Sequence, residues 1–253
     1  MNPLAIYTVV LAVINYPFVL GVEWSGRRSA RRAIFAVAQA VGQREREIGN
    51  SWLTTPVHAV LFIAFIGTGA LRTAPEGLLA ALATFALTFL WTEIWHYASH
   101  VAMHTRPLLF IHREHHRSHV TGAWSAVSFS LLEKLVFSLG ILGGLALVSR
   151  LHPLSALGIF AYYVVYFYSN ALGHANVEIR GPTYYRGIWA HLFNTPTYHA
   201  LHHARYVRNY GLMTPWLDRL FGTGWFDVAA VQARVASGRP LTRLGEKCRE
   251  GGL

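Results

Sequence analysis

Long apolar runs alternate with shorter polar segments along the chain. Five runs approach the length of about 20 residues that a helix needs to cross a hydrocarbon core of about 30 Å. They cover residues 3–20, 53–71, 78–95, 131–148 and 154–168. Their length and lack of strict alternation argue against the strands of a membrane barrel. We therefore predict an all-α fold, a multi-pass transmembrane helical bundle with four to five spans.

The composition supports a membrane protein, because 53% of the 253 residues are hydrophobic and only 13% are charged, against about 25% charged in soluble domains. The first run has the length of a signal peptide. However, no basic residue precedes it, no small-residue cleavage site follows it, and its arginines come after it. We expect it to be a span.

The distribution of arginines predicts the orientation, since basic residues collect in cytoplasmic loops. The loops after the first and third runs contain several arginines, whereas those after the second and fourth runs contain only Arg72 and Arg150. This alternation puts the arginine-rich loops, and everything after residue 168, on the cytoplasmic side. All the histidine-dense segments are then expected there, in a helical cap.

No repeat, linker or composition shift marks a second domain, so we expect one membrane-embedded domain over residues 1–228. Its histidine-rich region is 91–224, and residues 229–253 are predicted to be a polar surface tail. The net charge of +10 fits anionic headgroups, and no nucleic-acid partner is expected because no such motif is present. The single cysteine, Cys248, excludes an internal disulfide and a thiolate-rich metal site.

The 14 histidines fall into groups with helical spacing, in which positions three and four apart share a face. One "HxxxH" and two "HxxHH" patterns supply eight of them, and "NALGHANVE" supplies a ninth. These candidate metal ligands are His96, His100, His112, His115, His116, His174, His199, His202 and His203.

Neutral imidazole is a common ligand of transition metals. A tetrahedral zinc site takes four ligands, so nine histidines indicate two metal ions. The ligand type alone leaves iron and zinc open. A histidine-rich metal transporter or zinc sensor is an alternative, but its ligands should lie near the bilayer midplane. A haem electron carrier would need only paired axial histidines.

Several other polar residues lie beside these groups. Glu93 precedes His96 by one turn and is predicted to accept a hydrogen bond from a ligand N–H; the alternative is a glutamate at the membrane interface. His104 and His119 are candidates for similar supporting positions. His191 is a candidate for an extra ligand or a supporting position. His58 is expected to pack or hydrogen-bond within a span, and Asp218 to form an ion pair with Arg219 or a cap.

At these segments the chain resembles the fatty acid hydroxylase and sterol desaturase superfamily, which are integral-membrane di-iron oxygenases. The resemblance rests on "WHYASH", "IHREHHRSH", "NALGHANVE", "PTYHALHH" and "RNYGLMTPWLDRLFGT", in that order. It implies that the nine histidines hold two iron ions, which zinc can replace during purification.

The chain departs from the family pattern at two positions. Asn170 stands where some relatives have a histidine, and it is a weak oxygen ligand, holds a water or only hydrogen-bonds. Ser130 in "FSLLEK" stands where many bacterial relatives have the histidine of "HPLE". We expect this second change to tune the pocket and leave the metal site intact.

The resemblance also implies the reaction and its partners. The substrate is a lipid from the bilayer, such as a fatty acyl chain or a sterol, and the cosubstrate is O2. The outcome is hydroxylation or desaturation of an unactivated C–H bond. Because the chain has no haem or ferredoxin-like segment, the electrons are expected from an external cytochrome b5-like or ferredoxin-like donor docking on the basic face.

Overall fold

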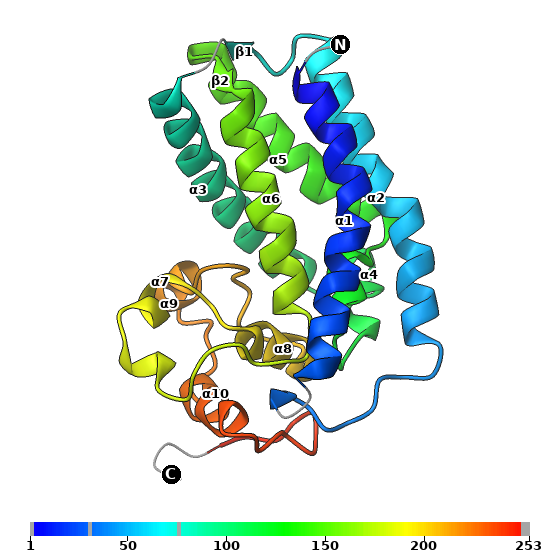
Figure 1. Cartoon of the computed structure of the whole chain (residues 1–253), viewed down its shortest axis with the longest axis vertical. Coiled ribbons are helices and arrows are strands. Elements are labelled where there is room, and N and C mark those ends of the chain that lie inside the picture. The colour runs from blue at the N-terminus through cyan, green and yellow to red at the C-terminus, as the bar shows by residue number, and fades with distance from the viewer. Residues whose placement is uncertain (1–2, 30–31, 75–76, 249–253) are drawn as a thin grey trace.

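The computed structural model describes residues 3–29, 32–74 and 77–248. Five long helices form a bundle, and shorter helices gather into a cap at one end of it (Figure 1). The long helices are α1 (Pro3–Arg28), α2 (Gln43–Gly67), α3 (Leu78–Met103), α5 (Leu131–Leu151) and α6 (Ala156–Gly173). The prediction of a mainly helical protein is confirmed.

Three of these helices, α2, α3 and α5, are long and apolar enough to cross a membrane. Their outward faces carry large exposed apolar side chains, among them Trp52, Val60 and Leu147. In water such faces would be costly, but hydrocarbon solvates them. The inward faces pack around Leu142, Leu145 and Ile159.

A short parallel pair of strands joins two hairpins at the end of the bundle opposite the cap. Strand β1 (Thr73–Ala74) pairs with β2 (Leu154–Ser155), directly before α3 and α6. The hydroxyl of Ser155 caps α6 by accepting a hydrogen bond from the Gly158 N–H. Both helices therefore start at this end and run toward the cap.

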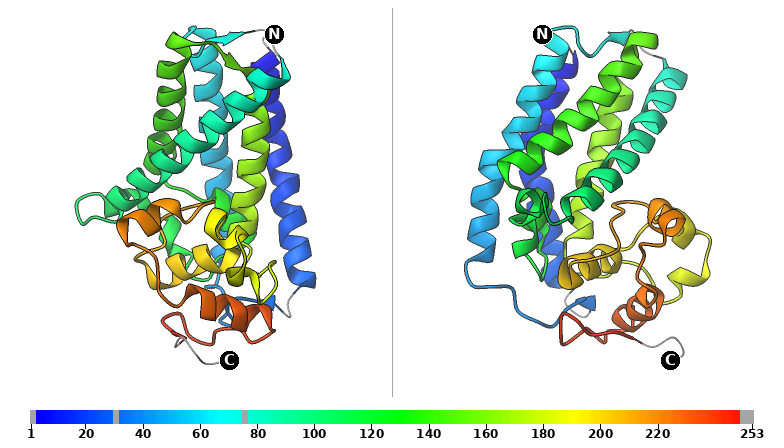
Figure 2. Two further views of the ribbon diagram at one scale, coloured as in Figure 1. Left: turned by 90° about the vertical axis from the view of Figure 1, so that its left-hand side faces the viewer. Right: turned by 180° about the vertical axis from the view of Figure 1, so that it is seen from behind.

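Helices α3 and α6 touch near their start and then diverge. A Cβ atom on Gly158 would lie 2.4 Å from the carbonyl oxygen of Ala81, so the two backbones approach more closely than any side chain would allow. Toward the cap α3 slopes away from α6, as the left view of Figure 2 shows. Residues of both helices, such as Phe89 on α3 and Ser169 on α6, line a cavity in this region.

The cap is built from short helices joined by loops. Those before α5 are α4 (Leu109–His112), η2 (His115–Arg117) and η3 (Ala123–Val127). Those after α6 are η4 (Tyr184–Arg186), α7 (Trp189–Leu192), α8 (Pro196–Arg205), α9 (Trp216–Phe221) and α10 (Val228–Ala236). Pro196 occupies the first turn of α8, where no backbone donor is needed.

Residues 229–248, which were expected to lie in a polar surface tail, are instead part of the packed cap, and residues 249–253 of that predicted tail lie outside the described part of the chain. Val228, Val231 and Val235 on α10 are buried against Leu201 and Leu241. Buried Arg205 of α8 also donates two hydrogen bonds, of 2.7 and 2.8 Å, to Asp227. The segment is polar on average, but its valines recur at helical spacing and form one buried face of α10. The prediction from average composition therefore missed this helix.

Candidate metal centre

The cap gathers nine histidines into two clusters. In each cluster, one nitrogen from every histidine lies within 4.8 Å of the others. We name them cluster A (His100, His104, His112, His116, His202) and cluster B (His115, His174, His199, His203). The two clusters contain eight of the nine candidate ligands, all except His96. The ninth cluster histidine is His104, which was expected in a supporting position.

Each "HxxHH" segment serves both clusters. His199 and His203 contribute to cluster B, whereas His202 between them contributes to cluster A. Successive side chains on a helix point about 100° apart, while positions four apart share a face. Helix α8 therefore lies between the clusters and sends side chains to each.

The segment "HREHH" divides its histidines in the same way without forming one continuous helix. His112 ends α4, and His115 and His116 begin the 3-10 turn η2. His112 and His116 join cluster A, whereas His115 joins cluster B. The spacing predicted that the histidines of each "HxxHH" segment share one face, whereas in both segments they divide between the two clusters.

The ring nitrogen Nδ1 of most cluster histidines donates to a backbone carbonyl oxygen. In cluster A, His100 donates to Tyr210 at 2.8 Å and His202 to Arg208 at 2.7 Å. In cluster B, the carbonyl acceptors for His115, His174 and His203 belong to Ser128, Asn170 and Ser118. Because a carbonyl can only accept, the proton is fixed on Nδ1 and the lone pair is left on Nε2.

The loop that follows α8 has an unusual backbone that aims two of these carbonyls. Tyr206, Arg208 and Asn209 have φ values of 70°, 66° and 54°, in the left-handed region that residues other than glycine rarely adopt. Such strain persists only where the surroundings enforce it, often at functional sites. Here the loop presents the carbonyls of Arg208 and Tyr210 to cluster A.

His112 differs because its acceptor is a carboxylate. Its Nδ1 lies 2.6 Å from Glu133 Oε1 on α5, and both side chains are buried. Ser130 caps the start of α5 by accepting the Glu133 N–H, and its own hydroxyl donates to the carbonyl of Ile111. Glu133 was missed from the sequence, although it lies in "FSLLEK", three residues after Ser130.

The remaining nitrogens are arranged as metal ligands would be. The Nε2 atoms of His100, His104 and His112 are buried and have no hydrogen-bond partner among the described residues. Other Nε2 atoms approach one another, with His202 and His116 3.0 Å apart and His199 and His174 3.0 Å apart. Two nitrogens that bind one ion at about 2.1 Å and at right angles would be about 3.0 Å apart. The donor set therefore fits two metal ions.

Burial keeps the cap histidines neutral, as ligation requires. Desolvation lowers the pKa of His115 to about 4 and that of His174 to about 3. It also lowers the pKa of His199 and His202 well below the usual 6.5. Both clusters can thus offer lone pairs at neutral pH.

Other candidates lie outside the clusters. His96 is in neither cluster, but its ring is stacked on Phe137, 5.3 Å away, and lines a small cavity between the clusters. His119 is exposed. His191 is also exposed and its Nδ1 lies 2.8 Å from Arg219. His58 bonds Ser138 within the bundle, in agreement with its predicted role.

Two acidic residues hold loops instead of their expected partners. Glu93 accepts from the backbone N–H of Met213 and of Thr214 and from the Thr214 hydroxyl; none of its described hydrogen bonds involves a histidine. Asp218 accepts from Tyr198, Tyr210, Gly211 and Thr223, whereas Arg219 bonds the α7 region. The predicted hydrogen bond from a ligand histidine to Glu93 and the predicted ion pair of Asp218 with Arg219 are corrected, because backbone N–H groups of nearby loops bond these carboxylates instead.

Asn170, one of the two departures expected from the family pattern, lies buried near the end of α6. Its side-chain amide donates to the carbonyl of Ala126 at 2.7 Å, and the residue lines the small cavity with His96, His174 and His199. Asn170 therefore connects α6 to the η3 segment beside cluster B. Of the three roles considered for Asn170, namely a weak oxygen ligand, a holder of a water molecule and a hydrogen-bonding residue, this contact corresponds to the third.

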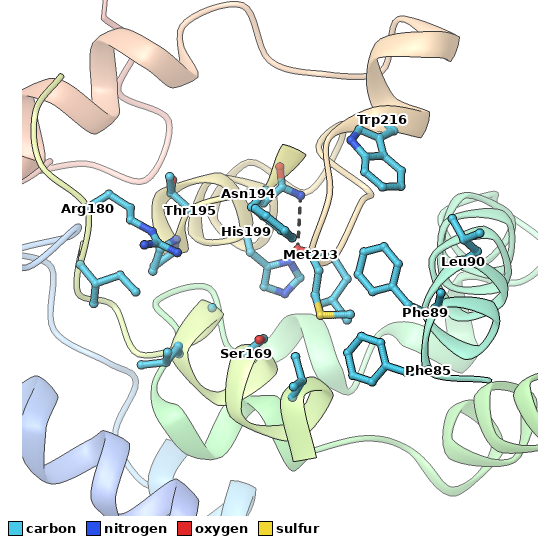
Figure 3. A pocket seen from close by; sticks show the side chains of 18 residues that line it. Phe85, Phe89, Leu90, Ser169, Arg180, Asn194, Thr195, His199, Met213 and Trp216 are labelled. Atoms are coloured by element: carbon cyan, nitrogen blue, oxygen red, sulfur yellow. Dashed lines mark hydrogen bonds between the residues drawn. The ribbon is translucent and has the colours of Figure 1, made fainter. Parts of the chain in front are cut away.

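A larger cavity of about 530 Å³ lies between α3, α6 and the cap (Figure 3). Its walls are mainly apolar, with Phe85 and Phe89 from α3, and Met213 and Trp216 from the cap. His199 of cluster B and Leu212 line both this cavity and the small one. An apolar chain in the larger cavity would thus reach a cluster histidine directly.

Comparison with known proteins places this arrangement in a family. The chain is 33% identical over 201 residues to the very-long-chain aldehyde decarbonylase GL1-1 of Oryza sativa subsp. indica, covering 76% of this chain and 32% of the relative. It is 33% identical over 141 residues to the very-long-chain aldehyde decarbonylase CER1 of Arabidopsis thaliana, covering 52% and 21%.

A third relative is the Delta(7)-sterol 5(6)-desaturase erg3C of Aspergillus fumigatus, 31% identical over 127 residues, with 45% of this chain and 39% of the relative covered. The chain thus spans about a third of the length of the rice relative. No solved structure matches. Residues 85–223, which are more than half of the chain and contain all nine cluster histidines, match the fatty acid hydroxylase family. The chain belongs to the fatty acid hydroxylase family.

Proposed function

We propose that the protein is a membrane-bound di-iron oxygenase that uses O2 and external electrons to hydroxylate, or alternatively desaturate, a lipid chain. The observation that carries this proposal is the contact between a metal-ligand cluster and a lipid-sized apolar cavity, made by His199. A metal store or transporter has no need for such a cavity. The family and its lipid-modifying relatives point the same way.

Nine histidines would hold the two iron ions, five in cluster A and four in cluster B. Bound iron would supply the activation of O2 and the oxidation of a C–H bond. The backbone carbonyls and Glu133 would keep the ligand rings oriented. The apolar walls around Phe89 and Met213 would exclude water from the reacting carbon.

The larger cavity offers a lateral entrance for a lipid. Leu90 on α3 and Val165 on α6 line it and are 48% and 43% exposed. Both lie on long apolar helices, at a level where hydrocarbon would surround the bundle. A substrate can therefore pass from the bilayer between α3 and α6 without crossing water.

We further propose that α1 and α6 cross the membrane with α2, α3 and α5, giving five spans and a cytoplasmic cap. Arginines support this orientation, since Arg27 and Arg28 end α1 at the cap, and Arg44 and Arg46 begin α2 there. Basic residues favour the cytoplasmic face. An acidic electron donor, cytochrome b5-like or ferredoxin-like, would dock on this face.

The relatives are named for different reactions, so their similarity alone does not select one reaction for this chain. Aldehyde decarbonylase activity is a feature of the rice and Arabidopsis relatives, and sterol desaturation of the fungal one. This chain covers only part of each. Hydroxylation remains the proposed reaction, with desaturation as the variant outcome of the same C–H oxidation.

The test begins with the metal content of protein purified anaerobically in detergent. We expect two irons per chain in the wild type, and a loss of about half or more in His202→Ala for cluster A and in His199→Ala for cluster B. His152→Ala is the matched control, because His152 is exposed at the opposite end of the bundle, and it should keep both ions.

The second step is to incubate the iron-loaded protein with lipid, reductant and ¹⁸O2. Incorporation of the label, or loss of two hydrogens, would support the oxygenase. Metal content that none of the cluster substitutions alters would refute the two sites. Two bound zinc ions transported across a vesicle membrane, without lipid oxidation, would favour the transporter instead.

A further inference from the structure

The larger cavity has a polar end and an apolar end. Phe85, Phe89 and Leu90 form the apolar end on α3, whereas Arg180 lies on the opposite side (Figure 3). His199 lies between them in the same view. Arg180 is the one charged side chain among the lining residues described. A ligand that fills this cavity therefore meets a cation at one end only.

The guanidinium of Arg180 has no ion-pair partner among the described residues. Its nearest acidic neighbour in sequence, Glu178, is buried and accepts hydrogen bonds from the side chain and backbone of Thr197 and from the Arg180 backbone N–H. The guanidinium instead lies over the Tyr184 ring, 5.4 Å from its centre. Its donors remain available to a ligand.

The path of the lining residues shows how a chain would extend from this cation. On α6 the lining runs from Val165 to Gly173, a rise of about 12 Å, and Arg180 follows shortly after the end of this helix. The lining thus leads from the cap into the middle of the bundle, passing His199. A chain bound with its head at the cap would have its tail between α3 and α6.

We propose that Arg180 binds the anionic oxygen head group of a long-chain lipid and thereby determines which carbon lies beside His199. A guanidinium presents paired donors that match a carboxylate or a phosphate. Asn194 lines the cavity too, but its Oδ1 is buried without a donor, and a bare acceptor would repel an anionic oxygen. The head group therefore belongs at Arg180. The inference rests on the proposed function for treating the bound lipid as substrate.

The test measures binding of a spin-labelled stearate to the iron-loaded protein in phosphatidylcholine nanodiscs. Stearate, stearyl phosphate and methyl stearate serve as competitors. We expect Arg180→Gln to weaken binding of the anionic chains about 10- to 100-fold and to leave the neutral ester unchanged. Arg180→Lys should retain part of the affinity. Arg186→Gln, an exposed neighbour that does not line the cavity, should change nothing.

The two anionic competitors show which head group the site prefers. Stronger competition by stearate than by stearyl phosphate would indicate a carboxylate, and the reverse order would indicate a phosphate. Methyl stearate that competes as well as stearate in the wild type, or anionic binding that survives in Arg180→Gln, would overturn the proposal. Product analysis gives an independent result, since Arg180→Gln should scatter the position of oxidation along the chain. Selective binding without any oxidation would refute the proposed function alone, whereas oxidation without head-group selectivity would refute this inference alone.

Discussion

Replacing Glu133 should weaken metal binding in cluster A without displacing a ligand. Its carboxylate is fully buried and lies 2.6 Å from His112 Nδ1. A carboxylate in this position fixes the ring and increases the basicity of the other nitrogen. Loss of such a partner costs about 10- to 100-fold in metal affinity, or about 1.4 to 2.7 kcal/mol.

Glu133→Gln keeps an acceptor but removes the charge, so we expect an effect near the lower limit. Glu133→Leu removes both and should approach the upper limit. The assay is a competition titration of the metal-depleted protein with a chelator of known affinity, under anaerobic conditions, with the two iron sites resolved. The weakened site should be the one that His202→Ala also removes.

Glu93→Gln is the matched control, since Glu93 is also a buried carboxylate on a long helix but bonds Met213 and Thr214 instead of a histidine. The Glu93→Gln variant should bind metal like the wild type. It should change lipid binding, because Glu93 holds the loop that carries the cavity-lining residue Leu212. Equal metal affinity in Glu133→Leu and the wild type would refute the reasoning. So would an equal loss in Glu93→Gln.

Three further predictions concern stability. Gly144→Ala should destabilise the protein by about 1 to 3 kcal/mol, because the new Cβ would lie 2.1 Å from the Trp91 ring, whereas Gly143→Ala meets nothing within 4 Å and should be neutral; thermal unfolding in detergent distinguishes them, and equal melting temperatures would contradict the packing. Arg205→Ala should cost about 3 to 5 kcal/mol, because it leaves the buried carboxylate of Asp227 unpaired; denaturant unfolding measures this, and a loss below about 1 kcal/mol would argue against it. The metal-free protein should lose stability as pH falls below about 6.5, since the lowered pKa values of His115 and His174 mean that the unfolded chain binds more protons, at about 1.4 kcal/mol per pH unit for each histidine; unchanged unfolding between pH 7.5 and 5.5 would exclude this linkage.

Sequence spacing identified most of the residues that converge in the cap. Positions three and four apart predicted histidines on shared faces, and eight of the nine candidates lie in the two clusters. The division between clusters was not predictable from spacing alone, because it depends on where α8 lies relative to α3 and η2. His104 shows the same limit. It lies one turn beyond His100, and only the fold brings it next to His112 and His202.

Supporting groups were harder to predict than ligands. Glu93 precedes His96 by one turn, which predicts a bond between them, but its carboxylate accepts hydrogen bonds from the loop at Met213 and Thr214. Glu133 lies 21 residues from His112, and no local pattern connects the two. Helix boundaries show a similar limit, since the apolar run at 53–71 corresponds to a helix that begins at Gln43. Its polar first turns form buried bonds, such as that of Glu47 with Ser118, which hydropathy does not register.

The use of main-chain carbonyls to orient the histidine rings has a consequence for how this centre tolerates mutation. Five of the acceptors, those of Ser118, Ser128, Asn170, Arg208 and Tyr210, are peptide groups. Every amino acid supplies the same carbonyl, so the protonation pattern of the rings depends on the course of the chain and not on these side chains. Substitutions there can change packing or substrate fit while the tautomers stay the same. Among the six cluster rings whose Nδ1 partner is described, that of His112 alone depends on a particular side chain. A single codon change at Glu133 would therefore alter the electronic character of a ligand.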